Sequence, residues 1–416
     1  MRIFKFGGAS VKDAAGVRNV VKVLKQVGYQ DTLLVISAMG KTTNAMEQIV
    51  DAYFNDKNQL EQAIDVVISN HKTILNDLFE IKNHEIHHKV NALIQEFRGF
   101  LMWNKSPKYA FVYDQVVGYG ELLSTTIVSA YLNEVGVTNQ WLDVRELIKT
   151  DNSYRDAHVN WNRTQKEVLA RVNIGELNIT QGFLGSDENN FTTTLGREGS
   201  DYSAAILAYC LKAESVTIWK DVPGVLNADP RHFDETELLH QISYREAIEL
   251  AFYGASVIHP KTLQPLQGRE IPLHVKSFLN PKQQGTTVGK GVKILPEVPC
   301  FIVKKGQVLL KLSSLDFSFI VEENMSEIFK LFHDYRLKVD LLQNSAISFS
   351  VCLDNTFNGL KEVLPLLEQK FKVTCHHDVS LYTIRHFDEH SVEKILNGYS
   401  VLVEQRGKET VQLVVK

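Results

Sequence analysis

RIFKFGGASVKDAAGVRNVVKVLKQVGYQDTLLVIS, residues 2–37, contains a complete strand, helix and strand pattern. Segment 2–6 predicts a strand that breaks at Gly7-Gly8, and segment 32–37 predicts a second strand. Between them, the i, i+3, i+4, i+7 spacing of one helical face occurs at Val17, Val20, Val21 and Leu24. A crossover helix between two such strands forms a right-handed βαβ unit, so we predict a mainly parallel sheet with helices on both faces.

The same alternation continues along the chain to about residue 295. Residues 44–100 have a helical pattern, as have 201–211, and apolar strands are predicted at 139–144, 177–183 and 215–219. We therefore assign the α/β fold class, with a three-layer domain over residues 1–295.

A different pattern begins at the sequence LPEVP, residues 295–299, where two prolines oppose both a continuing helix and a central strand. Strands are predicted at 308–315, 339–342, 347–353, 379–384, 399–403 and 411–415, with helices around 325–332 and 391–396. We interpret residues 296–416 as two tandem α+β modules of the ferredoxin-like βαββ type.

Composition narrows the classes of partner. The chain has 416 residues, and 45 Lys plus Arg nearly balance 49 Asp plus Glu, so no global basic field favours nucleic acid or an anionic membrane. The four cysteines lie far apart and are expected to be reduced core thiols. The first strand leaves no room for a signal peptide, and the apolar runs are shorter than the ~20 residues that span a bilayer, so we expect a cytoplasmic protein.

The first chemical motif is KFGGASV, residues 5–11. Gly7 and Gly8 let backbone N–H groups approach phosphate oxygens, while Lys5 supplies a cation and Ser10 a hydroxyl at the start of a helix. This combination favours a phosphate site. A tight turn would need only the two glycines, so that alternative stays open.

The second motif is TTTLGREGSDY, residues 192–202, directly before a helix. Arg197 could bind a carboxylate through two hydrogen bonds and Asp201 an ammonium group, a pair that suits a zwitterionic amino acid. The alternative is a solvated loop in which Ser200 or Asp201 caps the helix.

The third motif is WKDVPGV, residues 219–225, with Asp229-Pro230-Arg231 close behind. It follows a strand end, where ligands bind in parallel α/β sheets. Lys220 and Arg231 are plausible phosphate contacts, and Asp221 could orient the site or its Mg²⁺. Taken singly, each of these residues is more often a surface charge.

Two further patterns do not support the sites that they superficially suggest. Gly40-Lys41-Thr42 follows a strand, but a P-loop requires glycine at position 35, which is Val35 here. The segment HEIHH, residues 84–88, matches a zinc-binding pattern on a helix, yet it lies in a polar region without an obvious third ligand. We expect neither a P-loop nor zinc.

Taken together, six segments resemble the aspartokinases in order and spacing: Lys5–Gly8, Gly120–Ser124, Thr192–Tyr202, Trp219–Gly224, Asp229–Arg231 and His259-Pro260. The resemblance implies an amino acid kinase domain over 1–295 and paired ACT regulatory domains over 296–416. It also implies transfer of the γ-phosphoryl group of MgATP to the β-carboxylate of L-aspartate, giving 4-phospho-L-aspartate, the first step towards lysine, threonine and methionine.

Residue roles follow from this resemblance. The catalytic residues would be Lys5 and Asp201. Aspartate would be held by Thr43, Glu121, Arg197, Gly199, Ser200 and Asp201. The nucleotide would contact Lys5, Gly7, Gly8, Ser10, Lys220, Asp221 and Arg231, and Mg²⁺ would arrive with ATP rather than in a dedicated site.

The chain also departs from the family pattern. Ser256 stands where relatives usually have a nucleotide-binding lysine, for which Lys220 could compensate, and Glu198 replaces a common glycine. In the first ACT module, Asp340 and Ser345 match an effector-binding segment, whereas Ala346 replaces a glutamate. We therefore expect an amino acid effector but weak sensitivity to lysine. A homodimer formed through the ACT modules is also expected, because a second copy commonly covers exposed edge strands.

Two alternatives remain. Another amino acid or carbamate kinase of the same fold is possible, although those enzymes generally lack paired C-terminal modules. The second alternative is a catalytically inactive amino acid sensor, suggested by Ser256 and Glu198. A panel of acceptor substrates separates the first alternative, and aspartate-dependent ADP release separates the second.

Overall fold

The computed structural model describes residues 1–81, 84–255 and 258–416. The chain divides into two compact units. The first unit consists of Met1–Val225, Leu238–Ile248 and Val257–Ile294. The second consists of Leu226–Glu237, Glu249–Ser256 and Leu295–Lys416.

The first unit is organised around an eight-stranded sheet with the order β10-β12-β11-β7-β1-β2-β4-β3. All neighbours in it are parallel except β11 and β12, so the predicted mainly parallel sheet is confirmed. Its strands are β1 (Arg2–Phe6), β2 (Thr32–Ile36), β3 (Gln140–Leu142), β4 (Leu177–Gln181), β7 (Ser215–Lys220), β10 (Gln241–Ser243), β11 (Leu273–Ser277) and β12 (Thr286–Gly289).

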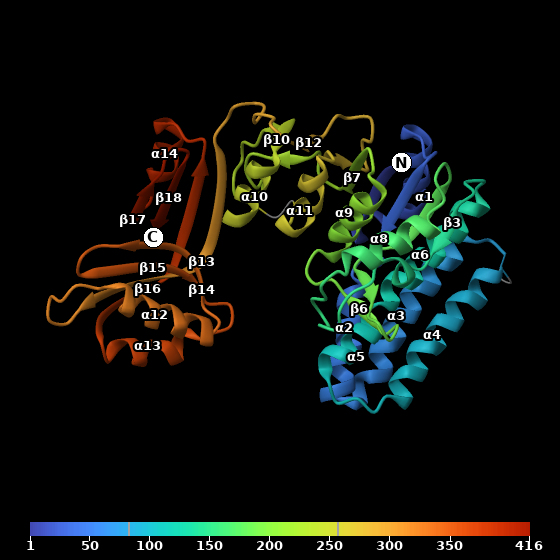
Figure 1. Cartoon of the computed structure of the whole chain (residues 1–416), viewed down its shortest axis with the longest axis horizontal. Helices are drawn as coiled ribbons and strands as arrows, with labels where there is room; N and C mark the ends of the chain where they lie inside the picture. Colours follow the sequence, from blue (N-terminus) through green and yellow to red (C-terminus); the bar gives the residue numbers. More distant parts are fainter. Residues whose placement is uncertain (82–83, 256–257) are drawn as a thin grey trace. The chain divides into compact units, whose positions relative to one another are not determined.

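Helices cover both faces of this sheet, as can be followed in Figure 1. Strand β2 is buried at all five positions, and because successive side chains point to opposite faces, both faces must be covered. One group of helices packs together as α1 (Ala14–Val27), α2 (Thr42–Asn55), α3 (Lys57–Leu78), α4 (Glu85–Trp103), α5 (Tyr109–Val117) and α6 (Tyr119–Glu134). A second group contains α7 (Val144–Leu147), α8 (Trp161–Arg171), α9 (Gly199–Leu211) and α11 (Pro260–Arg269). The predicted three-layer arrangement is therefore confirmed.

Short elements complete the connections. The 3₁₀ turn η1 (Gly8–Val11) follows β1 and leads to α1, which Asp13 caps by accepting a 2.7 Å hydrogen bond from the backbone N–H of Gly16. A hairpin is formed by β5 (Leu184–Ser186) and β6 (Thr192–Thr194). The remaining elements are β8 (Val225–Leu226), β9 (Leu238–Leu239) and α10 (Tyr244–Tyr253).

The second unit contains a six-stranded antiparallel sheet with the order β14-β15-β13-β16-β18-β17. Its elements are β13 (Cys300–Ser314), α12 (Glu322–Asp334), β14 (Lys338–Asn344), β15 (Ser348–Asp354), α13 (Leu360–Glu368), β16 (Phe371–Arg385), α14 (Glu389–Leu396), β17 (Val401–Arg406) and β18 (Thr410–Val415). Figure 1 shows α12 and α13 side by side against this sheet, and their apolar faces enter one core with β13 and β15.

This arrangement is more interleaved than two consecutive βαββ units. Strand β13 begins eight residues before the predicted strand, and its first part, residues 300–304, pairs with residues 381–385 of β16. Both modules therefore share two long strands of a single sheet. Helix α13 and the first half of β16 were not predicted, because Pro365 and the polar residues of the segment KVTCHHD, 372–378, hide the regular pattern.

Candidate active site

A cavity of about 540 Å³ opens where β1, β2, β4 and β7 end. Carboxyl ends of parallel strands are where α/β proteins bind ligands. The predicted site residues that line it are Lys5, Thr43, Glu121, Arg197, Gly199, Ser200, Asp201 and Lys220. The structure therefore brings together residues that are more than 200 positions apart in sequence. Residues that were not predicted to line it are Ser37, Glu47, Tyr113, Arg155, Phe183, Gly196 and Glu198.

Lys5 and Asp201 form an ion pair at the end of β1. Lys5 Nζ lies 2.6 Å from Asp201 Oδ1, and the two residues are only 9% and 4% exposed. Asp201 lies in the first turn of α9, where the helix dipole stabilises negative charge. Burying such a pair costs desolvation energy, so it is weak evidence for stability and is better explained by a role in the site.

Glu121 is buried in the first turn of α6 and has one unused oxygen. Its Oε1 accepts a 3.3 Å hydrogen bond from the backbone N–H of Ala38, whereas Oε2 has no hydrogen-bond partner among the described residues. Burial raises the pKa of Glu121 to about 8, and the nearby Lys5 opposes this shift. A cationic group entering the cavity would therefore find a carboxyl group that ionises in its presence.

The loop before α9 presents Arg197 to the cavity. Gly196 has φ +79°, and a Cβ there would lie 2.6 Å from Asp156 Oδ1, so this turn requires glycine. Arg197 is exposed, and in residues 1–81, 84–255 and 258–416 no carboxylate forms an ion pair with it. Its guanidinium is thus available for an anionic ligand.

Arg155 enters the same cavity from the loop after β3 and α7. Its guanidinium carbon lies 4.6 Å from the ring centre of Tyr113, a residue of α5. The Tyr113 hydroxyl donates a 2.6 Å hydrogen bond to Glu47 of α2. The sequence did not predict this cluster, because its members come from three distant segments. The run of polar residues around Arg155 was the one local signal that could have suggested it.

Backbone strain is concentrated at the cavity. Three non-glycine residues that line it have positive φ angles: Arg155 at 73°, Phe183 at 71° and Glu198 at 53°. Such conformations persist only where surrounding contacts hold them, and they gather at functional sites. Glu198 stands where the family commonly has glycine, so a charged residue here adopts a conformation that favours glycine.

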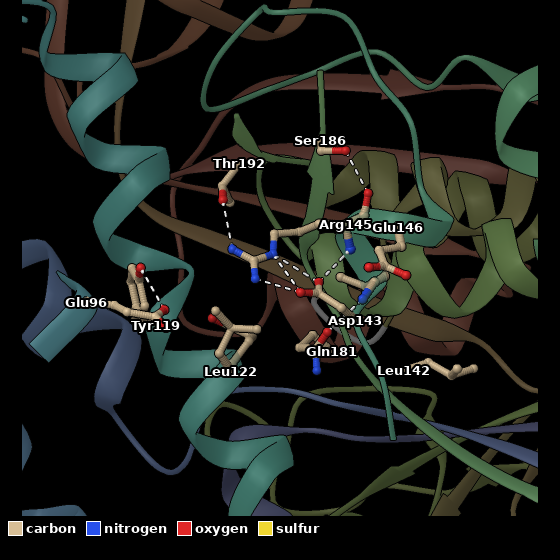
Figure 2. Close-up of polar contacts among 12 residues, drawn as sticks. Glu96, Tyr119, Leu122, Leu142, Asp143, Arg145, Glu146, Gln181, Ser186 and Thr192 are labelled. Atoms are coloured by element: carbon tan, nitrogen blue, oxygen red, sulfur yellow. Dashed lines mark hydrogen bonds and ion pairs between the residues drawn. The ribbon is translucent and has the colours of Figure 1, made fainter. Parts of the chain in front are cut away.

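A partly buried network of polar contacts, drawn in Figure 2, connects the loops near the cavity. Arg145 of α7 forms an ion pair of 2.6 Å with Asp143 and donates a 3.4 Å hydrogen bond to Thr192 of β6. Gln181, at the end of β4, accepts a 2.8 Å hydrogen bond from the backbone N–H of Val144. These contacts tie the ends of β3 and β4 to the hairpin that leads to Arg197.

The glycines predicted to bind phosphate, Gly7 and Gly8, follow Lys5 in the chain but do not line the cavity. A Cβ on Gly8 would lie 2.7 Å from the carbonyl oxygen of Gly40, and a Cβ on Gly7 would lie 3.3 Å from Lys5 Nζ. Ser10 is buried, and its hydroxyl donates a 3.5 Å hydrogen bond to the carbonyl of Trp219. Ser10 thus connects η1 to β7 in this structure.

The remaining predicted nucleotide contacts are spread over both units. Lys220 lines the cavity, whereas Asp221 is exposed and does not line it. Arg231 belongs to the second unit and forms a 2.5 Å ion pair with Asp229, which lowers the pKa of Asp229 to about 2. Ser256, the departure from the family lysine, lies outside the described residues.

The two predicted effector residues lie in the second unit. The Asp340 carboxylate is almost fully buried and contacts Lys304 Nζ at 2.8 Å and Lys338 Nζ at 3.5 Å. Ser345 is exposed, and its hydroxyl lies 2.7 Å from that of Ser348. Asp340 is therefore already neutralised within the chain.

The zinc-like pattern has a local structural role. His84 precedes α4 and caps it, with Nδ1 accepting a 3.1 Å hydrogen bond from the backbone N–H of Ile86. Within the described ranges, no group of three His, Cys, Asp or Glu residues is arranged to hold a metal ion.

In the same ranges, no helix combines the length and apolar character that crossing a bilayer requires. None of the described cysteines forms a disulfide; Cys210, Cys300 and Cys352 are buried as expected, whereas Cys375 is half-buried.

Comparison with known proteins agrees with this architecture. The sequence model of the amino acid kinase family matches residues 1–277, and the chain belongs to that family. Within the family it belongs to the aspartokinases. It is 32% identical over 359 residues to lysine-sensitive aspartokinase 3 of Escherichia coli, covering 85% of this chain and 78% of the relative.

A plant relative is longer. The chain is 28% identical to the chloroplastic bifunctional aspartokinase/homoserine dehydrogenase 2 of Arabidopsis thaliana, covering 87% of this chain but only 41% of the relative. The structure resembles E. coli aspartokinase III in complex with lysine and aspartate, with a TM-score of 0.84, 27% identity, and coverage of 100% of this chain and 96% of that chain. The complex of the same enzyme with aspartate and ADP gives a TM-score of 0.80 at 26% identity, with the same coverage.

Proposed function

We propose that this protein is an ATP-dependent aspartate kinase that converts L-aspartate to 4-phospho-L-aspartate, the first step towards lysine, threonine and methionine. The observation that carries the proposal is the joint presence of the Lys5–Asp201 ion pair, the buried Glu121 and the available Arg197 in one cavity. These groups match the charges of an amino acid with a second carboxylate.

The acceptor side would bind the zwitterion through opposite charges. Arg197 would bind a carboxylate of aspartate, and the unused oxygen of Glu121 would accept a hydrogen bond from its ammonium group. Thr43, Gly199, Ser200 and Asp201 would complete the aspartate site. The related E. coli aspartokinase III has been crystallised with aspartate, which supports this choice of acceptor.

The donor side would bind MgATP, with Mg²⁺ entering as part of the substrate. Lys5 and Lys220 line the cavity. Gly7 and Gly8 follow Lys5 in the chain, and their backbone N–H groups would bind phosphate oxygens. Further contacts with the nucleotide would come from Ser10, Asp221 and Arg231. The complex of the E. coli enzyme with ADP supports a nucleotide site.

The reaction needs no general base. The β-carboxylate oxygen of aspartate attacks the γ-phosphorus, a new P–O bond forms, and the bond between the γ-phosphorus and the bridging oxygen breaks to release ADP. Because the nucleophile is already ionised, the main obstacle is repulsion between two anions. Lys5 would stabilise charge on the transferring group, while Asp201 fixes the position of Lys5.

The test is a coupled assay of ADP formation with aspartate, glutamate and N-acetylglutamate as acceptors. We expect turnover with aspartate at least 10-fold above that with either alternative, because a misplaced carboxylate loses the aligned attack. The absence of aspartate-dependent ADP formation would favour the inactive sensor. Comparable turnover with another acceptor would favour a different amino acid kinase.

We further propose that residues 1–295 form the catalytic domain and 296–416 the tandem ACT modules, which bind an amino acid effector and form a homodimer. The support is physical: β14 and β17 are the outer strands of the second sheet, and Phe317 and Phe319 are 81% and 71% exposed. A second copy would cover these groups. We also propose a cytoplasmic location, where MgATP is available as substrate.

A further inference from the structure

We propose that Arg155 is a specificity-determining residue of the acceptor site, where its guanidinium binds the α-carboxylate of aspartate together with Arg197. This inference rests on the proposed aspartate kinase function. It assigns a substrate contact to a residue outside the motifs that identify the family.

The side chain of Arg155 is prepared to bind an anion. It lines the cavity, and its guanidinium carbon lies 4.6 Å from the ring centre of Tyr113 and 5.6 Å from that of Tyr109. Stacking on an aromatic face leaves the N–H groups at the edge of the guanidinium free to donate in its plane. Among the described residues no carboxylate forms an ion pair with the Arg155 guanidinium; the buried Asp114 carboxylate attracts it electrostatically but accepts its hydrogen bonds from the backbone N–H, so the guanidinium N–H groups stay available to a ligand anion.

The backbone of Arg155 is held in a strained conformation. Its φ of 73° is unfavourable for any residue with a Cβ and would suit glycine. Both carboxylate oxygens of the buried Asp114 accept hydrogen bonds of 3.1 Å from the backbone N–H of Arg155. Asp114 also accepts hydrogen bonds from the backbone and hydroxyl of Thr194. These contacts explain the backbone conformation, but a glycine at position 155 would make them equally well. The arginine must therefore be required for its side chain.

The loop that contains Arg155 is fixed at further points. The Asp151 carboxylate accepts hydrogen bonds from the backbone N–H groups of Ser153 and His158 at 3.1 and 3.0 Å. The Tyr154 hydroxyl donates a 3.2 Å hydrogen bond to Asp187. A guanidinium on a fixed loop can bind a carboxylate with little loss of conformational entropy.

Arg155 and Lys5 have different electrostatic neighbours, which indicates that Arg155 lies away from the reacting groups. Burial is the main cause of the raised pKa of both Glu121 and Tyr113, but the cation that opposes the shift is Lys5 for Glu121 and Arg155 for Tyr113. Lys5 thus acts beside Glu121 and Asp201, while Arg155 acts beside Tyr113 and Glu47. Because the β-carboxylate must reach the phosphoryl group at Lys5, Arg155 is assigned to the carboxylate that does not react.

The experiment compares wild type with Arg155→Gln, using L-aspartate and its α-amide, in which the α-carboxylate is uncharged. With aspartate, we expect KM to rise about 10-fold or more while kcat and the KM for ATP stay within about twofold, as for a contact equal in ground and transition states. With the α-amide, the same substitution should change KM by less than about twofold, since the partner charge is absent. Arg163→Gln, at an exposed arginine of α8 outside the cavity, is the matched control and should leave all constants unchanged.

A second variant separates binding from folding. Arg155→Gly relieves the positive φ, so its melting temperature should equal or exceed that of wild type while its KM for aspartate rises as in Arg155→Gln. A lower melting temperature together with an unchanged KM would assign Arg155 a purely structural role and overturn the inference. An equal loss with aspartate and the α-amide would also overturn it.

Calorimetric titration with aspartate distinguishes this inference from the proposed function. If wild type binds aspartate but forms no ADP, the proposed function fails, and weaker binding by Arg155→Gln would still support the contact. If wild type is active and Arg155→Gln binds aspartate equally well, only the inference fails. If wild type does not bind aspartate, both fail.

Discussion

Lys5 is the residue whose charge the proposed reaction uses most directly. We expect Lys5→Ala to lower kcat by about 10²-fold or more, with a smaller effect on the KM for aspartate, because a contact with developing charge acts on the chemical step. Steady-state kinetics with both substrates varied would measure the two constants. Equal turnover of the variant and wild type would remove Lys5 from the mechanism.

This substitution also leaves Asp201 buried without its cation. Such a loss typically costs ~3–5 kcal/mol of stability, so the variant must be compared at a temperature where it remains folded. Thermal unfolding of Lys5→Ala and of the double variant Lys5→Ala with Asp201→Asn would separate destabilisation from lost catalysis. The double variant should recover stability but not turnover.

Glu121 predicts a pH dependence that differs between the free and the aspartate-bound protein. Its folded-state pKa of about 8 lies above its ordinary value of 4.5, so the folded state binds the proton more tightly than the unfolded state. The stabilising contribution of this proton is therefore complete below pH 4.5 and is lost as the pH rises through about 8, at ~1.4 kcal/mol per pKa unit. Without substrate, the melting temperature of wild type should fall from pH 6.5 to pH 9 relative to that of Glu121→Gln.

Aspartate binding should follow the opposite trend. The ammonium group of the substrate pairs with ionised Glu121, so aspartate affinity should rise as the pH approaches 8, and this rise should disappear in Glu121→Gln. Calorimetric titrations across the pH range would show this. Parallel pH profiles for the two proteins would contradict the assigned role of Glu121.

At the scale of elements, the loops after β1 and β2 are in direct contact. The backbone N–H of Gly40 donates a 3.0 Å hydrogen bond to the carbonyl of Gly8, and a Cβ on Gly8 would lie 2.7 and 2.9 Å from the carbonyl oxygens of Gly40 and Ala38. We expect Gly8→Ala to destabilise the fold by roughly 1–3 kcal/mol, because both obstructing atoms are backbone oxygens of the loop after β2, which cannot turn aside as a flexible side chain could. Urea unfolding would measure the difference, and kcat should fall as the loop shifts.

Gly99 provides the matched control. It lies in the interior of α4, and nothing is within 4 Å of a Cβ placed on it. Gly99→Ala should therefore stabilise the protein by roughly 0.5–1 kcal/mol through reduced backbone entropy of the unfolded state, without changing kcat. If Gly8→Ala behaved like Gly99→Ala, the close approach of the two loops would be wrong.

At the scale of the whole molecule, regulation by lysine should be weak. Ala346 removes one acid from the segment that resembles an effector site, and Lys304 already neutralises Asp340 at 2.8 Å. A lost charge-assisted contact is typically worth ~1.5–3 kcal/mol, or roughly 10- to 150-fold in affinity. We expect lysine at about 1 mM to inhibit the enzyme by less than half. This concentration equals the Kd of a weak ligand with a binding free energy of about 4 kcal/mol.

Initial rates at increasing lysine concentration, with threonine tested in parallel, would check this expectation. Inhibition at micromolar lysine would show that another acid, such as Glu322 or Glu323 in the first turn of α12, supplies the missing charge. Lys304→Met would then be informative. It removes the nearer of the two cations that contact the Asp340 carboxylate and should increase lysine sensitivity if Asp340 lies in the effector site.

Self-association should depend on the exposed aromatic residues of the second unit. We expect the double variant Phe317→Asp and Phe319→Asp to shift the protein from dimer to monomer in sedimentation experiments, because two charges replace apolar surface that a second copy would cover. Ile174→Asp, at a 75% exposed apolar residue of the first unit, is the control and should remain dimeric. A monomeric wild type would contradict the proposed homodimer.

Local sequence patterns were sufficient to predict the alternation of strands and helices, the α/β class and most of the motif residues at the cavity. These features are local: apolar periodicity sets the elements, and glycines and charges at strand ends mark the loops. Lys5 could be selected because it lies at a strand end before two glycines, and Arg197 and Asp201 because the segment 192–202 concentrates glycines, hydroxyls and charges directly before a helix.

The further residues of the cavity, and the two strands that both modules share in the second sheet, became visible from the folded structure alone. Arg155, Tyr113 and Glu47 come from separate segments, and neither the positive φ of Arg155 nor the burial that raises the pKa of Glu121 can be read from neighbouring residues. The pairing of residues 300–304 with 381–385 likewise joins segments about 80 positions apart. Strain, desolvation and long-range strand pairing arise from packing between distant parts of the chain, which local sequence patterns do not encode.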